Sequence, residues 1–361
     1  MYLTEEKKKY REKLKNPSQE EIDYRSYEYA LFCANIKKFI PKIYKNSNTI
    51  NLFKDYMYYA WISTLEQYNH EYLINTTIVN NSAINFNQIE PIIFCSFHYG
   101  SFRLLNSYLY ELGHKIVIIV ADDVFNKQEK DLMDNVMPML KGTKNSDFII
   151  LNVTKRSSIF KLKELISKGY HMTVYLDGNT GINDNNQSFE KGFIPISFLN
   201  KTVYVRNGIG KLAALLKATI VPSITHRDKE ENNHLTFYKA IKISDFTSKQ
   251  EFALKSIETV YNIFENELIN SPMQWGTWIY IHKWFKRDYT TPYNNNENPQ
   301  NLFNTDRYLF FKLGTSNFLF DLIDYKSYPI EKNIYESIIQ NEIEKLNSNI
   351  YKELINKNII I

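Results

Sequence analysis

The sequence is poor in the features on which several common classes of protein depend. Only two of its 361 residues are cysteines, Cys33 and Cys95, which excludes a disulfide-stabilised scaffold and a cysteine-rich zinc module. The longest aliphatic run spans residues 116–121, far short of the roughly 20 residues that a membrane-spanning helix needs. Residues 1–16 contain no apolar segment of the secretory-signal type. We expect a cytoplasmic protein, with peripheral contact to the inner face of the membrane as the alternative.

The charge balance argues against a nucleic-acid-binding protein. The 44 basic and 40 acidic residues leave a net charge of +4, which is too small an excess to indicate binding to a polyanion. The chain also has neither the G-x-x-x-x-G-K-[ST] phosphate loop nor the G-x-S-x-G serine-hydrolase motif. Apolar residues make up 43% and charged residues 23%. We therefore expect a folded globular chain of two domains or of one large α/β domain.

The hydrophobic pattern changes once along the chain. Residues 1–80 place apolar side chains at helical spacing, whereas the chain beyond them alternates short apolar runs with helical segments. The short runs predict strands at residues 91–97, 115–121, 147–152, 171–176, 219–226 and 234–240, with a hairpin at 194–198 and 201–205. The helical segments are residues 102–112, 126–139, 159–167, 208–216 and 250–268. This alternation predicts an α/β fold with a central, mostly parallel sheet flanked by helices.

The last part of the chain has a different composition. Residues 290–301 are rich in Asn and Pro and have the composition of a linker. Beyond them we expect strands at residues 308–313 and 318–322 and one helix at residues 331–354. The expected organisation is a helical N-terminal region (1–85), an α/β domain (86–289), a linker (290–301) and a small α+β C-terminal module (302–361).

One strand-to-helix junction carries candidate chemistry. His98 follows a predicted buried strand and precedes Gly100, Ser101 and a predicted helix. Ligands of open α/β sheets bind beyond the carboxyl ends of the strands, and an imidazole there can accept a proton from a hydroxyl or an amine. A capping or packing histidine is the alternative. Alternation along the strand directs Cys95 and His98 to opposite sides of the sheet, so we expect neither a metal site nor thiol chemistry, and no cofactor.

The segment around His98 resembles a known family. PIIFCSFHYGSFRLL, residues 91–105, is similar to the first block of the lysophospholipid acyltransferase superfamily, and most similar to the branch of the lipid A late acyltransferases, the lauroyl and myristoyl transferases. Residues 164–181, 208–222 and 271–286 resemble the later blocks of that branch, in the same order. Together the four blocks span about residues 90–288. They are moderately specific evidence for a divergent member.

The resemblance implies a fold of the glycerolipid acyltransferase type and an activity. An acyl group would pass from an acyl thioester, either acyl-CoA or acyl carrier protein, to a hydroxyl or amine, with His98 as general base. Members of the lipid A branch carry an N-terminal membrane anchor, and this sequence shows none. We therefore expect a soluble or peripheral acceptor, a small molecule or a peptide.

The sequence departs from the family at one position that matters. The family has an acidic residue five positions after the histidine, and this chain has Arg103. An arginine only donates hydrogen bonds, so it cannot accept the imidazole N–H. Either another carboxylate orients His98, with Asp177, Asp122 and Asp123 as candidates, or the base is lost and the chain is a non-catalytic relative that binds acyl chains, a carrier protein or a peptide. Arg103 also suits a phosphate or carboxylate of a substrate.

The remaining candidates follow from their positions. Asp177 stands where the family has an acidic loop residue, and a turn that bonds its own backbone is the alternative. The closing segment contains Trp275, Trp278 and Trp284, which we expect to be core aromatics. The catalytic candidates are thus His98 and Asp177, and the expected substrate contacts are Gly100, Ser101, Arg103, Asn179 and Arg206.

Overall fold

The computed structural model describes residues 2–86, 90–120, 130, 132–152, 158–178, 192–287 and 301–361. Contacts between residues divide the chain into two compact units. One unit contains Met1–Lys54 and Trp278–Ile361, and the other contains Asp55–Thr277. We describe each unit by itself. The domain boundaries expected from the sequence stay predictions.

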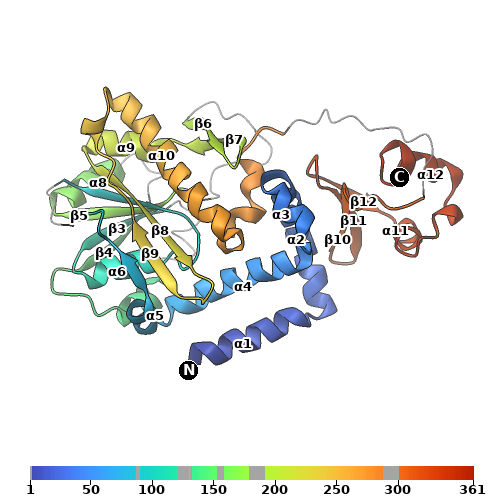
Figure 1. The fold of residues 1–361 in the computed structure, drawn as a ribbon, viewed down its shortest axis with the longest axis horizontal. Coiled ribbons are helices and arrows are strands. Elements are labelled where there is room, and N and C mark those ends of the chain that lie inside the picture. Colours follow the sequence, from blue (N-terminus) through green and yellow to red (C-terminus); the bar gives the residue numbers. More distant parts are fainter. Residues whose placement is uncertain are drawn as a thin grey trace. The chain divides into compact units, whose positions relative to one another are not determined.

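The second unit is built on a seven-stranded sheet with the strand order β1-β9-β8-β2-β5-β3-β4 (Figure 1). Its strands are β1 (Ile78–Asn80), β2 (Ile92–Ser96), β3 (Lys115–Val120), β4 (Asp147–Asn152), β5 (Tyr170–Tyr175), β8 (Thr219–Arg227) and β9 (Asn233–Phe237). Neighbouring strands run parallel, except that β8 and β9 pair antiparallel. All five residues of β2 are buried, as expected for a central strand with neighbours on both sides. The predicted α/β class is confirmed.

Helices flank this sheet. They are α4 (Thr49–Gln67), which begins in the other unit, α5 (His70–Thr76), α6 (Leu104–Glu111), α8 (Ser158–Ser167), α9 (Gly208–Leu216) and α10 (Lys249–Asn270). One apolar core joins α6 to the sheet through residues such as Leu105, Phe94 and Val221. Helices α9 and α10 pack against each other, and a Cβ on Gly210 would meet the Ala253 carbonyl at 2.0 Å. A glycine is therefore needed where these two helices cross.

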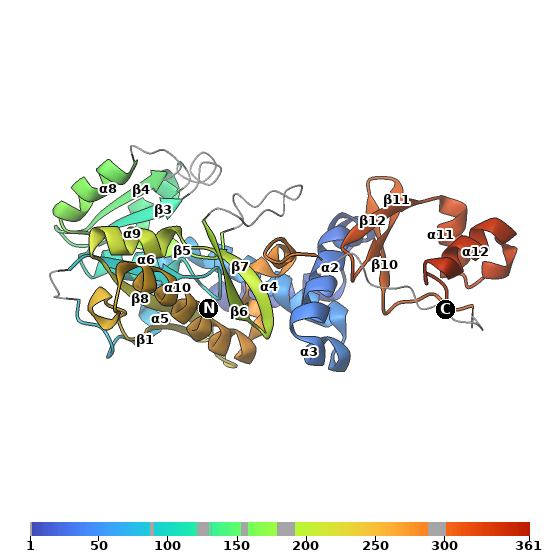
Figure 2. The same cartoon turned by 90° about the horizontal axis from the view of Figure 1, so that it is seen from above.

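Two segments of the second unit extend or correct the expectations. The predicted hairpin is present as β6 (Phe193–Phe198) and β7 (Lys201–Arg206), which form a separate two-stranded sheet (Figure 2). The helix expected at residues 126–139 lies partly outside the described residues. Its described end is a π-helical turn at Leu132–Val136 followed by a 3₁₀ turn at Met137–Met139. Pro138 lies in that turn, and a proline cannot donate the hydrogen bond that would continue an α-helix.

The first unit combines N-terminal helices with the C-terminal module. Its elements are α1 (Tyr2–Lys15), α2 (Gln19–Phe39), α3 (Pro41–Asn46), β10 (Tyr308–Leu313), β11 (Ser316–Asp321), β12 (Lys326–Ile330), α11 (Lys332–Ile339) and α12 (Ser348–Asn356). Helix α2 packs on β10, where the Ser26 hydroxyl accepts the Lys312 backbone N–H at 2.9 Å. Buried Arg307 donates to Asp321 at 3.0 Å and to Asp324 at 3.3 Å.

The expectation for the C-terminal module was wrong in two places. Strand β12 was not predicted, and the single helix expected at residues 331–354 is two helices, α11 and α12. Asn341 adopts a φ of 55°, which breaks helical geometry. The Asn347 side chain then accepts the Asn349 N–H at 2.8 Å and caps α12.

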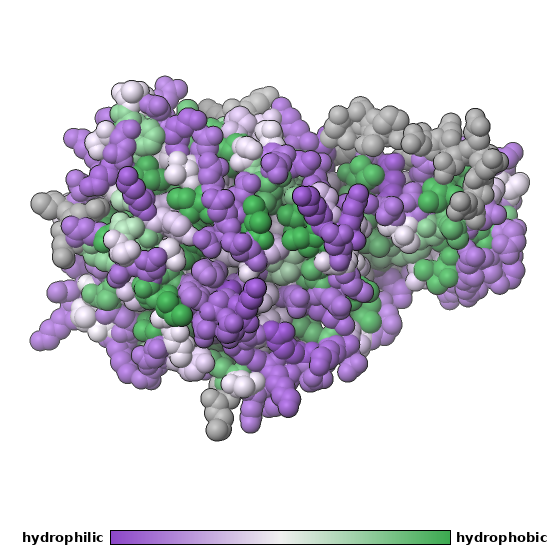
Figure 3. Space-filling view, viewed as in Figure 1, coloured by the Kyte–Doolittle hydropathy of each residue, from purple (hydrophilic) through white to green (hydrophobic). Residues whose placement is uncertain are grey.

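The surface seen in Figure 3 is mostly hydrophilic, with hydrophobic residues scattered over it. No helix within the described ranges has both the length and the apolar character required to cross a membrane.

Candidate active site

His98 and Asp177 meet at the carboxyl edge of the sheet. Strands β2 and β5 are parallel neighbours in which Ser96 lies opposite Tyr175. Each candidate follows its strand by two residues, so the shared register brings them to the same height. His98 Nδ1 lies 2.7 Å from Asp177 Oδ1, and the His98 backbone N–H donates to Oδ2 at 2.9 Å. The alternative carboxylates Asp122 and Asp123 lie outside the described residues.

Asp177 is a buried anion surrounded by donors. Its side chain is 0% exposed, and its Oδ2 also accepts the Trp275 indole N–H at 2.8 Å and the Thr277 hydroxyl at 3.0 Å. Burial alone would raise the pKa of this carboxyl. The charge of His98 and hydrogen bonds from His98 and Trp275 outweigh that effect and hold the pKa of Asp177 below its ordinary value. The carboxylate is therefore charged at neutral pH.

The carboxylate also fixes the His98 tautomer. An ionised carboxylate only accepts hydrogen bonds, so Nδ1 carries the proton and Nε2 of the neutral ring holds a lone pair. The His98 side chain remains 36% exposed. Its ring packs against Phe102 and Tyr175, with centroids 4.8 and 5.0 Å away. An accessible imidazole that is oriented by a buried carboxylate has the arrangement of a general base.

The backbone after His98 is held in place from two sides. Gly100 has a φ of 56°, and a Cβ there would lie 2.9 Å from both the Thr225 carbonyl oxygen and the His226 Cα. Thr225 donates its hydroxyl to the Tyr99 carbonyl at 2.6 Å. Glycine is thus required at position 100 by conformation and by space. The expected substrate contact of Gly100 stays a prediction.

Ser101 belongs to a buried network that the sequence analysis missed. Its hydroxyl donates to Glu66 and accepts a hydrogen bond from the Arg227 guanidinium at 2.7 Å. Glu66 and Arg227 form an ion pair, and both side chains are buried. The Ser101 hydroxyl is therefore engaged inside the protein. Nothing in the sequence indicates this pairing, because Glu66 and Arg227 are 161 residues apart.

The two candidate arginines lie on different elements. Arg103 immediately precedes α6, and its guanidinium carbon is 4.3 Å from the centroid of the Phe102 ring that also contacts His98. Burial raises the pKa of Tyr175, and the charge of Arg103 opposes that rise, so Arg103 acts electrostatically within the site. Arg206 ends β7, is exposed, and lies 5.2 Å from the Phe193 ring centroid. Asn179 falls outside the described residues.

The closing segment contributes more than packing. Trp275, Trp278 and Trp284 are buried, as expected for core aromatics. Trp275 in addition donates to Asp177, and Thr277 does the same. The signal that could have found this contact is general, since a buried indole N–H usually has a hydrogen-bond partner.

Across the described ranges, no group of three or more His, Cys, Asp or Glu residues could hold a metal ion. Cys33 and Cys95 are buried and unpaired. Burial raises the pKa of the Cys33 thiol to about 12 and raises that of Cys95 as well, which disfavours the nucleophilic thiolate.

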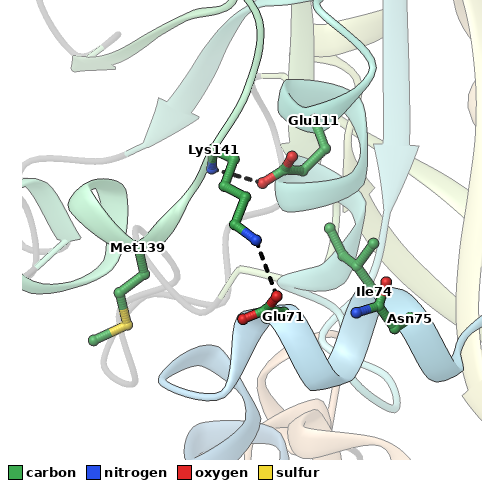
Figure 4. Close-up of a pocket in the computed structure, with 6 residues that line it drawn as sticks. All are labelled: Glu71, Ile74, Asn75, Glu111, Met139 and Lys141. Atoms are coloured by element: carbon green, nitrogen blue, oxygen red, sulfur yellow. Dashed lines mark hydrogen bonds and ion pairs between the residues drawn. The ribbon is translucent and has the colours of Figure 1, made fainter.

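A small pocket lies beside the C-terminal end of α6, where Glu111 is labelled (Figure 4). Its volume is about 110 Å³, and it is lined by Glu71, Ile74, Asn75, Glu111, Met139 and Lys141. Lys141 forms an exposed ion pair with Glu71 at 2.9 Å, and its backbone N–H donates to Glu111 at 2.8 Å. Glu111 is the last residue of α6, whereas His98 precedes the helix. The pocket is therefore separate from the His98–Asp177 pair.

The fold and the pair define an α/β unit with an oriented histidine at the carboxyl edge of its sheet. No family model matches the chain, and no curated protein matches it. Among solved structures it is similar to the 1-acyl-sn-glycerophosphate acyltransferase PlsC from Thermotoga maritima. The identity is 11% and the TM-score is 0.33, over 68% of this chain and 96% of that chain. The function proposed below therefore depends on the geometry of the site and on the sequence blocks.

Proposed function

We propose that this chain is an acyltransferase of the lysophospholipid acyltransferase type, which moves an acyl group from an acyl thioester to a hydroxyl or amine. The observation that carries the proposal is the 2.7 Å contact between His98 Nδ1 and the buried, ionised Asp177. It supplies from a neighbouring strand the carboxylate that Arg103 cannot supply. The four ordered sequence blocks over about residues 90–288 support the same class.

The chemistry follows from this pair. His98 Nε2 takes the proton from the acceptor hydroxyl or amine while the acceptor oxygen or nitrogen attacks the thioester carbonyl. The tetrahedral intermediate then collapses by breaking the carbon–sulfur bond, and the thiolate leaves with the proton that His98 had accepted. Asp177 stabilises the imidazolium between these two steps without taking the proton itself. The products are the acylated acceptor and a free thiol.

The substrates are the second part of the proposal. We propose acyl-CoA or an acyl carrier protein as donor, and a small molecule or peptide, soluble or at the membrane surface, as acceptor. Arg103 supports an anionic group on one of them, because its guanidinium lies beside the Phe102 ring that contacts His98 and can bind a phosphate or carboxylate through two donors. Arg206, exposed at the end of β7, is the weaker candidate for a second anion contact.

The test is the release of free thiol from a panel of acyl-CoA and acyl carrier protein thioesters. Transferases without acceptor hydrolyse their donor slowly, so the acceptor need not be known. We expect thiol release by the wild type and a loss of at least about 100-fold in His98→Ala, because a general base contributes 10²- to 10⁴-fold. The control is His114→Ala, which removes the imidazole of a histidine directly before β3 and should retain the wild-type rate. The absence of thiol release by both the wild type and His98→Ala, with both proteins folded, would favour the non-catalytic binding relative.

A further inference from the structure

We propose that residues 274–277 position the His98–Asp177 pair, and that Trp275 and Thr277 are positioning residues of the base. The sequence blocks gave this segment a packing role only. The inference rests on the proposed function, and its test below includes a measurement that does not need turnover.

The first argument is the orientation of the carboxylate. A carboxylate can rotate about its Cβ–Cγ bond and exchange its two oxygens. The Trp275 indole N–H and the Thr277 hydroxyl both donate to Oδ2, at 2.8 and 3.0 Å. Oδ1 faces His98, with Nδ1 at 2.7 Å and the backbone N–H donating at 3.1 Å. Two donors on one oxygen resist the rotation and keep Oδ1 directed at His98 Nδ1. The ionised carboxylate held in this way keeps the imidazole in the Nδ1–H tautomer, which leaves Nε2 able to accept a proton.

The second argument is that the same segment also holds the backbone of His98. The Gly276 N–H donates to the His98 carbonyl at 2.9 Å, and the Gly100 N–H donates to the Gln274 carbonyl at 3.2 Å. Tyr99 and Trp275 form an antiparallel bridge between these bonds. One four-residue segment therefore holds both members of the pair, although it follows His98 by more than 170 residues. A purely space-filling role would not require polar contacts to both members.

The third argument concerns the charge of Asp177. The titratable groups facing Asp177 are His98, Tyr175, which ends β5, and Tyr261 on α10. The charge of Arg103 lowers the pKa of Tyr175 against the effect of burial. Burial raises the pKa of both tyrosines and the Asp177 charge adds to it, so both phenols are neutral at pH 7. The charge and hydrogen bonds of His98 and the hydrogen bond from the Trp275 indole lower the pKa of Asp177 against the effect of its burial. Loss of a donor therefore raises the pKa of Asp177.

The test compares threonine variants that differ by one hydroxyl. Thr277→Val removes the donor and keeps the shape, and Thr277→Ser keeps a hydroxyl. Thr173→Val is the matched control, since the buried Thr173 hydroxyl on β5 has no hydrogen-bond partner in the described part of the structure. Trp275→Phe removes the indole N–H. Thiol release gives kcat and KM. Nitrogen-15 shifts of His98 report its tautomer, and carbon-13 shifts of the Asp177 carboxyl report its titration.

We expect Thr277→Val to lower kcat about tenfold at unchanged KM, since a hydrogen bond to a charged group is lost, and Thr277→Ser to stay within about twofold of wild type. The Asp177 carboxyl should titrate at higher pH in Thr277→Val and Trp275→Phe, and the share of the Nδ1–H tautomer should fall. The inference is overturned if Thr277→Val matches Thr173→Val in both NMR readouts. If the wild type releases no thiol, the proposed function fails, and the NMR comparison still decides the positioning role.

Discussion

Replacing Asp177 by asparagine tests directly whether this carboxylate orients His98. The change is nearly isosteric, but four donor groups converge on the carboxylate: the backbone N–H and Nδ1–H of His98, the Trp275 indole and the Thr277 hydroxyl. An amide offers one acceptor oxygen and one NH₂ group. The NH₂ must therefore face a former donor. The indole and backbone N–H cannot reverse, whereas His98 can, by moving its proton from Nδ1 to Nε2.

That reversal removes the base. In Asp177→Asn, Nε2 carries the proton and has no lone pair for the acceptor, and the imidazolium loses its counter-ion. For the same change in an oriented Ser-His-Asp site the loss is about 10⁴-fold in kcat, and we expect a loss of about 10³- to 10⁴-fold here. The assay is thiol release under saturating thioester, with exposed Asp134→Asn as the control. A folded Asp177→Asn protein that keeps more than about a tenth of the wild-type kcat would refute the assignment of Asp177 as orienter.

The same variant has a consequence for acid stability. Asp177 has a folded-state pKa below its ordinary value of 3.8. It therefore contributes stability that is present above that value and is lost as the pH falls through the folded-state pKa. Asp177→Asn lacks this contribution, so its free energy of unfolding should fall less steeply than that of the wild type below about pH 4. At pH 7 we expect it to be lower by about 1–3 kcal/mol, measured by urea unfolding. Parallel pH dependences would contradict the buried anion.

Two further substitutions test the parts that hold the His98 loop. Gly100→Ala places a Cβ 2.9 Å from the Thr225 carbonyl oxygen at a φ of 56°, and should lower the free energy of unfolding by about 2–4 kcal/mol; an unchanged urea midpoint would show that the loop can move aside. Glu66→Gln leaves the buried Arg227 guanidinium without its anion and should cost about 3–5 kcal/mol. A thermal shift of less than about 2 °C would show that water or Ser101 replaces the carboxylate.

The architecture of the sheet could be predicted because short apolar runs and helical segments alternate along the chain. The position of His98 at a strand end followed from the same pattern. The contact between His98 and Asp177 could not be predicted from that pattern. It requires β2 and β5 to be neighbours in the sheet, whereas β3 and β4 lie between them in the sequence. Strand order arises from packing across the whole sheet, which a single sequence pattern does not encode.

The break in the C-terminal helix and the hydrogen bond from Trp275 to Asp177 were not predicted, because the local sequence pattern does not mark either of them clearly. The helix expected at residues 331–354 has continuous helical periodicity, yet Asn341 adopts a positive φ and Asn347 starts a new helix. Asparagine tolerates that conformation without marking it as clearly as glycine would. Trp275 was correctly predicted to be buried, but its bond to Asp177 joins segments 98 residues apart. A spacing rule cannot find such a contact.

Arg103, five positions after His98, is compatible with the proposed base because the carboxylate that contacts His98 comes from Asp177, at the end of β5. Position 103 falls directly before α6, and the end of β5 reaches the same imidazole from the neighbouring strand. The Coulomb energy falls with distance, and Asp177 is in direct contact with the ring at 2.7 Å. The Arg103 guanidinium lies against the Phe102 ring, which the His98 ring also contacts. With the anion at the end of β5, the proposed base does not need an acidic residue at position 103, and the anion contact proposed for Arg103 does not conflict with it.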